Sequence, residues 1–132
     1  METLRLCRAA LRASMEQQTE VRMLRAMAPG SPEERAQIAR QLADSEAALA
    51  AQKRLYAMRA QDAAKVLLGV EGREKQVLWM YYVLGFTIKR ISEHLKLNYR
   101  DVLKCKAKAI QTVEEEEKHE PGNDHREPDA RP

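Results

Sequence analysis

The chain has few of the residues that build sheets, metal centres or disulfide-bonded folds. Aromatic residues make up 5% of its 132 residues, and there are two cysteines, five glycines and five prolines. Cys7 and Cys105 belong to no Cys-x-x-Cys pair and no Cys/His cluster, so two free thiols are expected. No long apolar run occurs, and charges interrupt 1–28 throughout, which argues against a signal peptide or a membrane span there. We therefore expect a cytoplasmic protein without a membrane partner.

Motifs for catalysis and for cofactor binding are missing as well. The chain has no nucleophile elbow, no phosphate-binding glycine loop and no metal-binding motif. His119 and His125 lie among carboxylates in a polar segment, and a chance pairing explains them better than a metal site does. We expect neither an enzyme nor a bound cofactor or metal.

What the sequence does contain favours an all-α fold. Charged residues make up 33% of the chain, and alanine, glutamate, lysine, leucine and arginine dominate it. The β-branched and aromatic residues cluster at 77–91, where they follow helical spacing and do not alternate. Little of the chain is therefore expected to form strands.

Two long helices are predicted in the first half of the chain. The first covers Glu2–Ala28 and stops at Pro29-Gly30, because proline removes a hydrogen-bond donor and glycine permits a turn. Ser31 is then a good N-cap, with proline at the first helical position and Glu34 three residues past the cap, which is a capping box. The second helix is expected to end near Leu68.

A coiled-coil spacing runs along this second helix. Its seam positions alternate by four and three residues: Ile38, Leu42, Ser45, Leu49, Gln52, Tyr56, Arg59 and Ala63. Three of the eight are polar or charged, which predicts a weak coiled coil. The two helices can fold back on each other as a hairpin or pair with another subunit, and we expect a homodimer formed through them. The sequence leaves both arrangements open.

Three shorter helices are predicted beyond a joint at 69–72. They cover Arg73–Leu84, Thr87 to about Leu95, and Asn98 to about Glu117, with Thr87 and Asn98 as N-caps. Gly85 is well placed as the left-handed residue that ends the first of them. The predicted organisation is therefore a helical arm or hairpin at 1–68, a helix-turn-helix module at 69–117 and a disordered polar tail at 118–132.

Positive charge is concentrated in the last two of these helices. Between 87 and 111 there are seven lysines and arginines against two acidic residues, a net charge of five. The residues from Glu114 onward reverse this sign, with eight acidic residues against three basic ones. A concentrated basic face suits a polyanion, whereas an acidic tail suits solubility or competition with that polyanion.

One pattern of residue types spans the predicted helix-turn-helix: Arg73 to Leu78, Tyr82, Gly85, Thr87, Ile91-Ser92, Leu95, Leu97-Asn98, Val102 and Ala109. Together with the apolar skeleton of 74–113 and its interleaved basic residues, this pattern resembles region four of the sigma-70 family of transcription factors. The whole layout, with a helical arm before this module, is similar to small regulators encoded by phages or prophages. The resemblance implies a transcription regulator that binds double-stranded DNA, with RNA polymerase as a possible partner.

Two departures from the sigma pattern matter. Lys96 stands in the inter-helix turn where glycine is common, which predicts a looser turn without a tight left-handed residue. There is also no counterpart of sigma region two, the part that melts the promoter in a full sigma factor. An activator or repressor built on region four alone therefore fits better than a complete initiation factor.

Helical spacing divides the last helix into two faces. Its buried face is predicted to hold Val102, Cys105, Ala109, Ile110 and Val113, and its opposite face Tyr99, Arg100, Leu103, Lys104, Ala107 and Lys108. Residues near the start of a recognition helix meet base edges, so the candidates for base contacts are Asn98, Tyr99, Arg100 and Lys104. The candidates for phosphate contacts are Thr87, Lys89, Arg90, Lys96 and Lys108. Arg100 suits a bidentate contact to guanine, while Asn98 is equally suited to capping.

Two other functions fit the same sequence. A small phage DNA-packaging subunit of the terminase type also joins a helix-turn-helix to helical oligomerisation segments. A helical protein-interaction module that contacts RNA polymerase without reading DNA would equally explain the long helices and the acidic tail.

Overall fold

The computed structural model describes residues 1–118, and over this range the chain is helical and contains no strand. The elements are α1 (Glu2–Ala26), α2 (Pro32–Val66), a 3₁₀ turn η1 (Leu67–Gly69), α3 (Gly72–Leu78), a π-helical turn η2 (Trp79–Val83), α4 (Ile88–Leu95) and α5 (Tyr99–Lys118). The all-α prediction is confirmed for these residues. The tail predicted at 118–132 lies outside the described residues except for Lys118, which ends α5.

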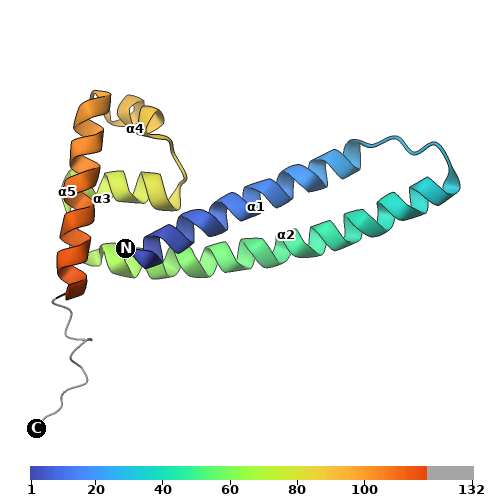
Figure 1. Ribbon diagram of the computed structural model, residues 1–132, viewed down its shortest axis with the longest axis horizontal. Helices are drawn as coiled ribbons and strands as arrows, with labels where there is room; N and C mark the ends of the chain where they lie inside the picture. Colours follow the sequence, from blue (N-terminus) through green and yellow to red (C-terminus); the bar gives the residue numbers. More distant parts are fainter. Residues whose placement is uncertain (119–132) are drawn as a thin grey trace, which may run out of the picture.

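Helices α1 and α2 lie side by side and antiparallel, joined at their far end by a short connection (Figure 1). Ser31 caps α2 as predicted, because its side chain accepts a hydrogen bond from the Glu34 N–H. The Glu34 carboxylate in turn accepts one from the Gly30 N–H at 2.9 Å. Helix α1 ends at Ala26, two residues earlier than predicted. Proline at 29 accounts for this, since it lacks an N–H and disfavours helical geometry in the residue before it.

The predicted seam of α2 is used inside the chain. All eight seam positions are buried or half-buried, and α2 packs along α1. The polar seam residue Ser45 lies in a small hydrogen-bonded layer, accepting from Gln17 at 2.6 Å and donating to Glu20 at 2.5 Å. The alternative that the sequence left open is therefore decided in favour of a hairpin for this face of α2.

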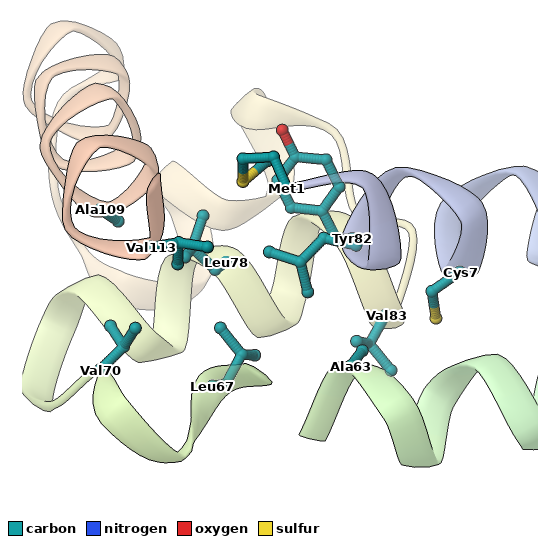
Figure 2. Close-up of a cluster of buried hydrophobic side chains, with 11 residues drawn as sticks. Met1, Cys7, Ala63, Leu67, Val70, Leu78, Tyr82, Val83, Ala109 and Val113 are labelled. Carbon is teal, nitrogen blue, oxygen red and sulfur yellow. The ribbon is translucent and has the colours of Figure 1, made fainter. Parts of the chain in front are cut away.

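One hydrophobic core joins the base of this hairpin to the helices that follow (Figure 2). It contains Met1, Leu4, Cys7, Ala63, Leu67, Val70, Leu78, Tyr82, Val83, Ala109 and Val113. These residues come from α1, α2, α3, η2 and α5 and from the joints between them. Residues on both sides of the predicted boundary at 69 thus share one core.

The helix predicted over Arg73–Leu84 is present, and it is helical without interruption from Gly72 to Val83: α-helical as far as Leu78 and π-helical from Trp79. Its last turn is π-helical, with the Leu84 N–H donating to the Trp79 carbonyl at 3.0 Å. Gly85 then ends the segment with φ +76°, as predicted. Glycine suits this position because a left-handed residue with a Cβ is strained.

The hairpin supplies hydrogen-bond donors to this π-helical turn. The Arg8 guanidinium of α1 donates to the Tyr81 carbonyl, and the Tyr56 hydroxyl of α2 donates to the Val83 carbonyl at 2.6 Å. A π turn leaves carbonyls without their usual α-helical partners, so donors from elsewhere stabilise it. These two contacts tie the π-helical turn to both helices of the hairpin.

A second, smaller core fixes α4 against α3 and α5. It consists of Val77, Met80, Ile91 and Val102, with partly buried apolar side chains around them.

Among residues 1–118, no helix combines the length and the apolar character that a bilayer span requires.

Candidate nucleic-acid interface

The turn between α4 and α5 is tighter than predicted. Lys96 adopts a left-handed conformation, with φ 57° and ψ 42°, so the expectation of a looser turn is wrong. The N–H groups of Lys96 and Leu97 both donate to the Ser92 carbonyl, which is the hydrogen-bond pattern of a helix ended by a left-handed residue. Leu97 also packs against the small core that contains Ile91. These interactions offset the roughly 1–2 kcal/mol that a left-handed residue with a Cβ costs.

Side chains cap both helices at their N-termini, as predicted. The Thr87 hydroxyl accepts from the Arg90 N–H at 3.1 Å, and the Asn98 side-chain oxygen accepts from the Asp101 N–H at 2.8 Å. The Asn98 oxygen is therefore used within the fold. Its amide nitrogen is the atom that remains for contact with another molecule.

Helix α5 has the two faces that its sequence predicts. Val102, Ala109 and Val113 are fully buried, while Cys105 and Ile110 are half-buried. The opposite face is exposed and consists of Tyr99, Arg100, Leu103, Lys104, Ala107 and Lys108. Tyr99 is 55% and Leu103 42% exposed, so this face presents apolar surface between its cations. It thus combines positive charge with side chains able to contact the apolar parts of a ligand.

Most of the candidate cations have no acidic partner among residues 1–118. Lys89, Arg90, Lys96, Arg100 and Lys104 are exposed, and none of them forms an ion pair there. Lys108 lies 3.9 Å from Glu74, at the outer limit of an ion pair. Arg100, Lys104 and Lys108 follow one another at intervals of four, where each like-charge pair destabilises a helix by about 0.2–0.5 kcal/mol. An anionic partner would relieve this repulsion.

Two other residues of α5 differ from these exposed cations. Lys106 is half-buried, and its ammonium lies 4.4 Å from the centre of the Tyr81 ring and 5.8 Å from that of Tyr82. It belongs to the contact between α5 and η2 and is less available to a partner.

Burial raises the pKa of the Cys105 thiol, so this group stays neutral at neutral pH and adds no negative charge to α5.

The structure brings one further set of cations to this region that the sequence did not assign to it. Arg8 and Arg12 of α1 line a groove together with Gly85 and Thr87, beside the start of α4. Their spacing marks one face of α1, but α1 was predicted only as an arm for oligomerisation or partner binding. Nothing in the local pattern signals that this arm folds back beside residue 87.

The described residues contain no group of three or more side chains arranged to hold a metal ion. The chain matches no protein-family model, and neither a curated protein nor a solved structure shows significant similarity to it. What the exposed basic face binds must therefore be argued from its chemistry.

Proposed function

We propose that this protein is a transcription regulator that binds double-stranded DNA in a sequence-specific manner through α4 and α5, as a helix-turn-helix. The observation that carries the proposal is a set of exposed cations on two capped helices and the tight turn between them, five of which form no ion pair with any of residues 1–118. DNA carries a dense array of phosphates, and its major groove admits one helix. The resemblance of 74–113 to sigma region four supports the same assignment.

In this proposal the first turns of α5 enter the major groove. Tyr99, Arg100 and Lys104 are the base-contacting residues, and Arg100 suits the paired acceptors of guanine. Asn98 contributes through its amide nitrogen alone, because its oxygen caps α5. The groups assigned to phosphates are Thr87, Lys89, Arg90, Lys96 and Lys108, all of which are exposed.

A second candidate function concerns the hairpin. Two methionines of α1, Met15 and Met23, and Met27 directly after this helix are between 52% and 65% exposed and recur at intervals of eight and four residues. Exposed methionines form adaptable apolar surfaces suited to protein contacts. They favour a protein partner for the hairpin, and the resemblance implies RNA polymerase as a candidate. If this were the only function, the basic face would bind no DNA at moderate salt.

The oligomeric state separates regulation from DNA packaging. A regulator is proposed to be a monomer or a homodimer, with half-sites about 34 Å apart in the dimer. A packaging subunit of the terminase type would form a large ring instead. Sedimentation of the full chain distinguishes these masses.

Fluorescence anisotropy with a duplex tests the proposal directly. Binding through about four to six phosphates gives a slope of log affinity against log salt of roughly −4 to −5. After site selection has supplied a preferred sequence, Arg100→Ala with Lys104→Ala is expected to weaken binding at least tenfold, since a good base contact contributes about 1–3 kcal/mol. The helical circular dichroism signal should not change.

The matched control is Lys53→Ala with Arg54→Ala, which removes the same two side-chain types from exposed positions of α2. Wild-type affinity is expected for this control. Equal affinities for both double variants would remove the assignment of the base-contacting residues, and absence of binding even at low salt would overturn the proposed function.

A further inference from the structure

One face of α1 carries positive charge close to α4. Arg5, Arg8 and Arg12 are spaced by three and four residues, so they lie on one side of the helix. No acidic residue occurs between Glu2 and Glu16. This stretch of the hairpin is therefore a basic strip, which we define as Arg5, Arg8 and Arg12.

The fold places the basic strip beside the candidate nucleic-acid interface. Arg8 and Arg12 line one groove with Leu11, Met15, Glu16, Thr19, Gly85 and Thr87. A second groove is lined by all three arginines together with Ala9, Ala13, Glu16, Tyr81 and Tyr82. Because Thr87 caps α4, Arg8 and Arg12 adjoin the end of α4 that is assigned to phosphate contacts, whereas Arg5 lies in the second groove with Tyr81 and Tyr82. Glu16 is the single acidic residue that lines either groove.

The members of the strip differ in how far the fold already uses them. Arg8 donates to the Tyr81 carbonyl, and its guanidinium lies 3.8 Å from the centre of the Tyr81 ring, which places it within the joint between α1 and η2. Lys106 of α5 lies over the same ring, so two cations meet at Tyr81. Arg5 and Arg12 are exposed and form no ion pair with any of residues 1–118. These two remain available to a partner.

We propose that Arg5 and Arg12 bind the phosphate backbone of the duplex beside the groove that α5 enters, so that the hairpin forms part of the DNA-binding surface. The inference rests on the proposed function and extends it from α4 and α5 to α1. In a helix-turn-helix the first helix crosses the DNA backbone, and in this proposal that helix is α4. Arg12 lines a groove together with Thr87, the residue that caps α4. Phosphate contacts add affinity and salt dependence without adding sequence preference.

The test compares two double variants that lose the same charge. Arg5→Gln with Arg12→Gln is expected to reduce the salt slope of duplex binding by about 2, because each phosphate contributes about 0.9. Affinity at moderate salt falls several-fold, while the ranking of duplex sequences stays as in the wild type. Arg22→Gln with Arg40→Gln, at exposed positions farther along the hairpin, is expected to leave the slope and the affinity unchanged. Arg5→Lys with Arg12→Lys keeps the charge and should restore most of the slope, which excludes misfolding as the cause.

Each outcome decides the inference. If the Arg5/Arg12 and Arg22/Arg40 glutamine variants bind alike, while Arg100→Ala with Lys104→Ala still weakens binding, the extension to α1 is wrong and the proposed function stands. A wild-type salt slope with an altered sequence ranking also overturns the phosphate role. If the wild-type protein binds no duplex at low salt, both proposals fail. Binding of an acidic peptide to the basic strip is then the hypothesis to test.

Discussion

At the scale of the residue, Lys96 combines a backbone role with a proposed charge role. Its left-handed conformation ends α4 and sets the direction in which α5 leaves. Its exposed ammonium is at the same time a candidate phosphate contact. Substitutions can separate the two roles, because glycine and alanine both remove the charge but only glycine relieves the strain.

Replacing Lys96 with glycine is expected to raise the free energy of unfolding by about 1 kcal/mol, since the relief of about 1–2 kcal/mol exceeds the extra chain entropy of glycine, about 0.5–1 kcal/mol. Lys96→Ala should leave stability near that of the wild type. Both variants should lose duplex affinity to the same degree. Urea denaturation and anisotropy measure these effects. A glycine variant no more stable than the alanine variant would contradict the strain argument.

At the scale of the element, the π-helical turn η2 depends on the hairpin for its hydrogen bonds. Val83 is buried, and its carbonyl accepts from the Tyr56 hydroxyl of α2. Helix α4 begins five residues after Val83, so the position of α4 depends in part on this contact. A buried carbonyl without a partner costs free energy, because water cannot replace the lost donor.

Tyr56→Phe removes that donor and keeps the ring. We expect a loss of about 1–3 kcal/mol in the free energy of unfolding, the cost of a buried polar group left unsatisfied. Tyr99→Phe is the matched control, because its side chain is 55% exposed and its hydroxyl forms no hydrogen bond with any of residues 1–118. Urea denaturation compares the two variants, and an equal, small effect of both would show that the Val83 carbonyl does not need Tyr56.

At the scale of the whole molecule, ionisable groups in the shared core are expected to make the free energy of unfolding decrease at alkaline pH. Cys7, Tyr56 and Tyr82 all lie in or against this core. Burial is the main cause that raises the pKa of each of them above its ordinary value, and neighbouring ionisable groups modify it for the two tyrosines. Raised pKa values mean that the folded protein holds these protons more tightly than the unfolded chain does.

The free energy of unfolding is therefore expected to be fully retained below about pH 9, the ordinary value for the Cys7 thiol, and to decrease as pH rises through the raised folded-state values. Urea denaturation at a series of pH values from 7 to about 11 measures this, and Tyr56→Phe should make the decrease shallower. A stability that is flat or rising over the alkaline range would show that these groups are not protected by the shared core.

The helices themselves were largely predictable, because their signals are local. Ser31, Thr87 and Asn98 act within three residues of their own position, and the faces of α5 follow from a spacing of three to four residues. The candidate interface on α4 and α5 could be named for the same reason. Its exposure agrees with the prediction, while its binding to DNA stays a prediction.

By itself, then, the sequence determined the helical class, the caps and the division of α5 into a buried and a basic face. The tertiary structure decided that α2 pairs with α1 in the same chain, that η2 is π-helical and that the arginines of α1 lie beside Thr87. The difference is one of range. Arg8 meets Tyr81 across 73 positions and Tyr56 meets Val83 across 27, and no helical periodicity encodes contacts between such distant residues.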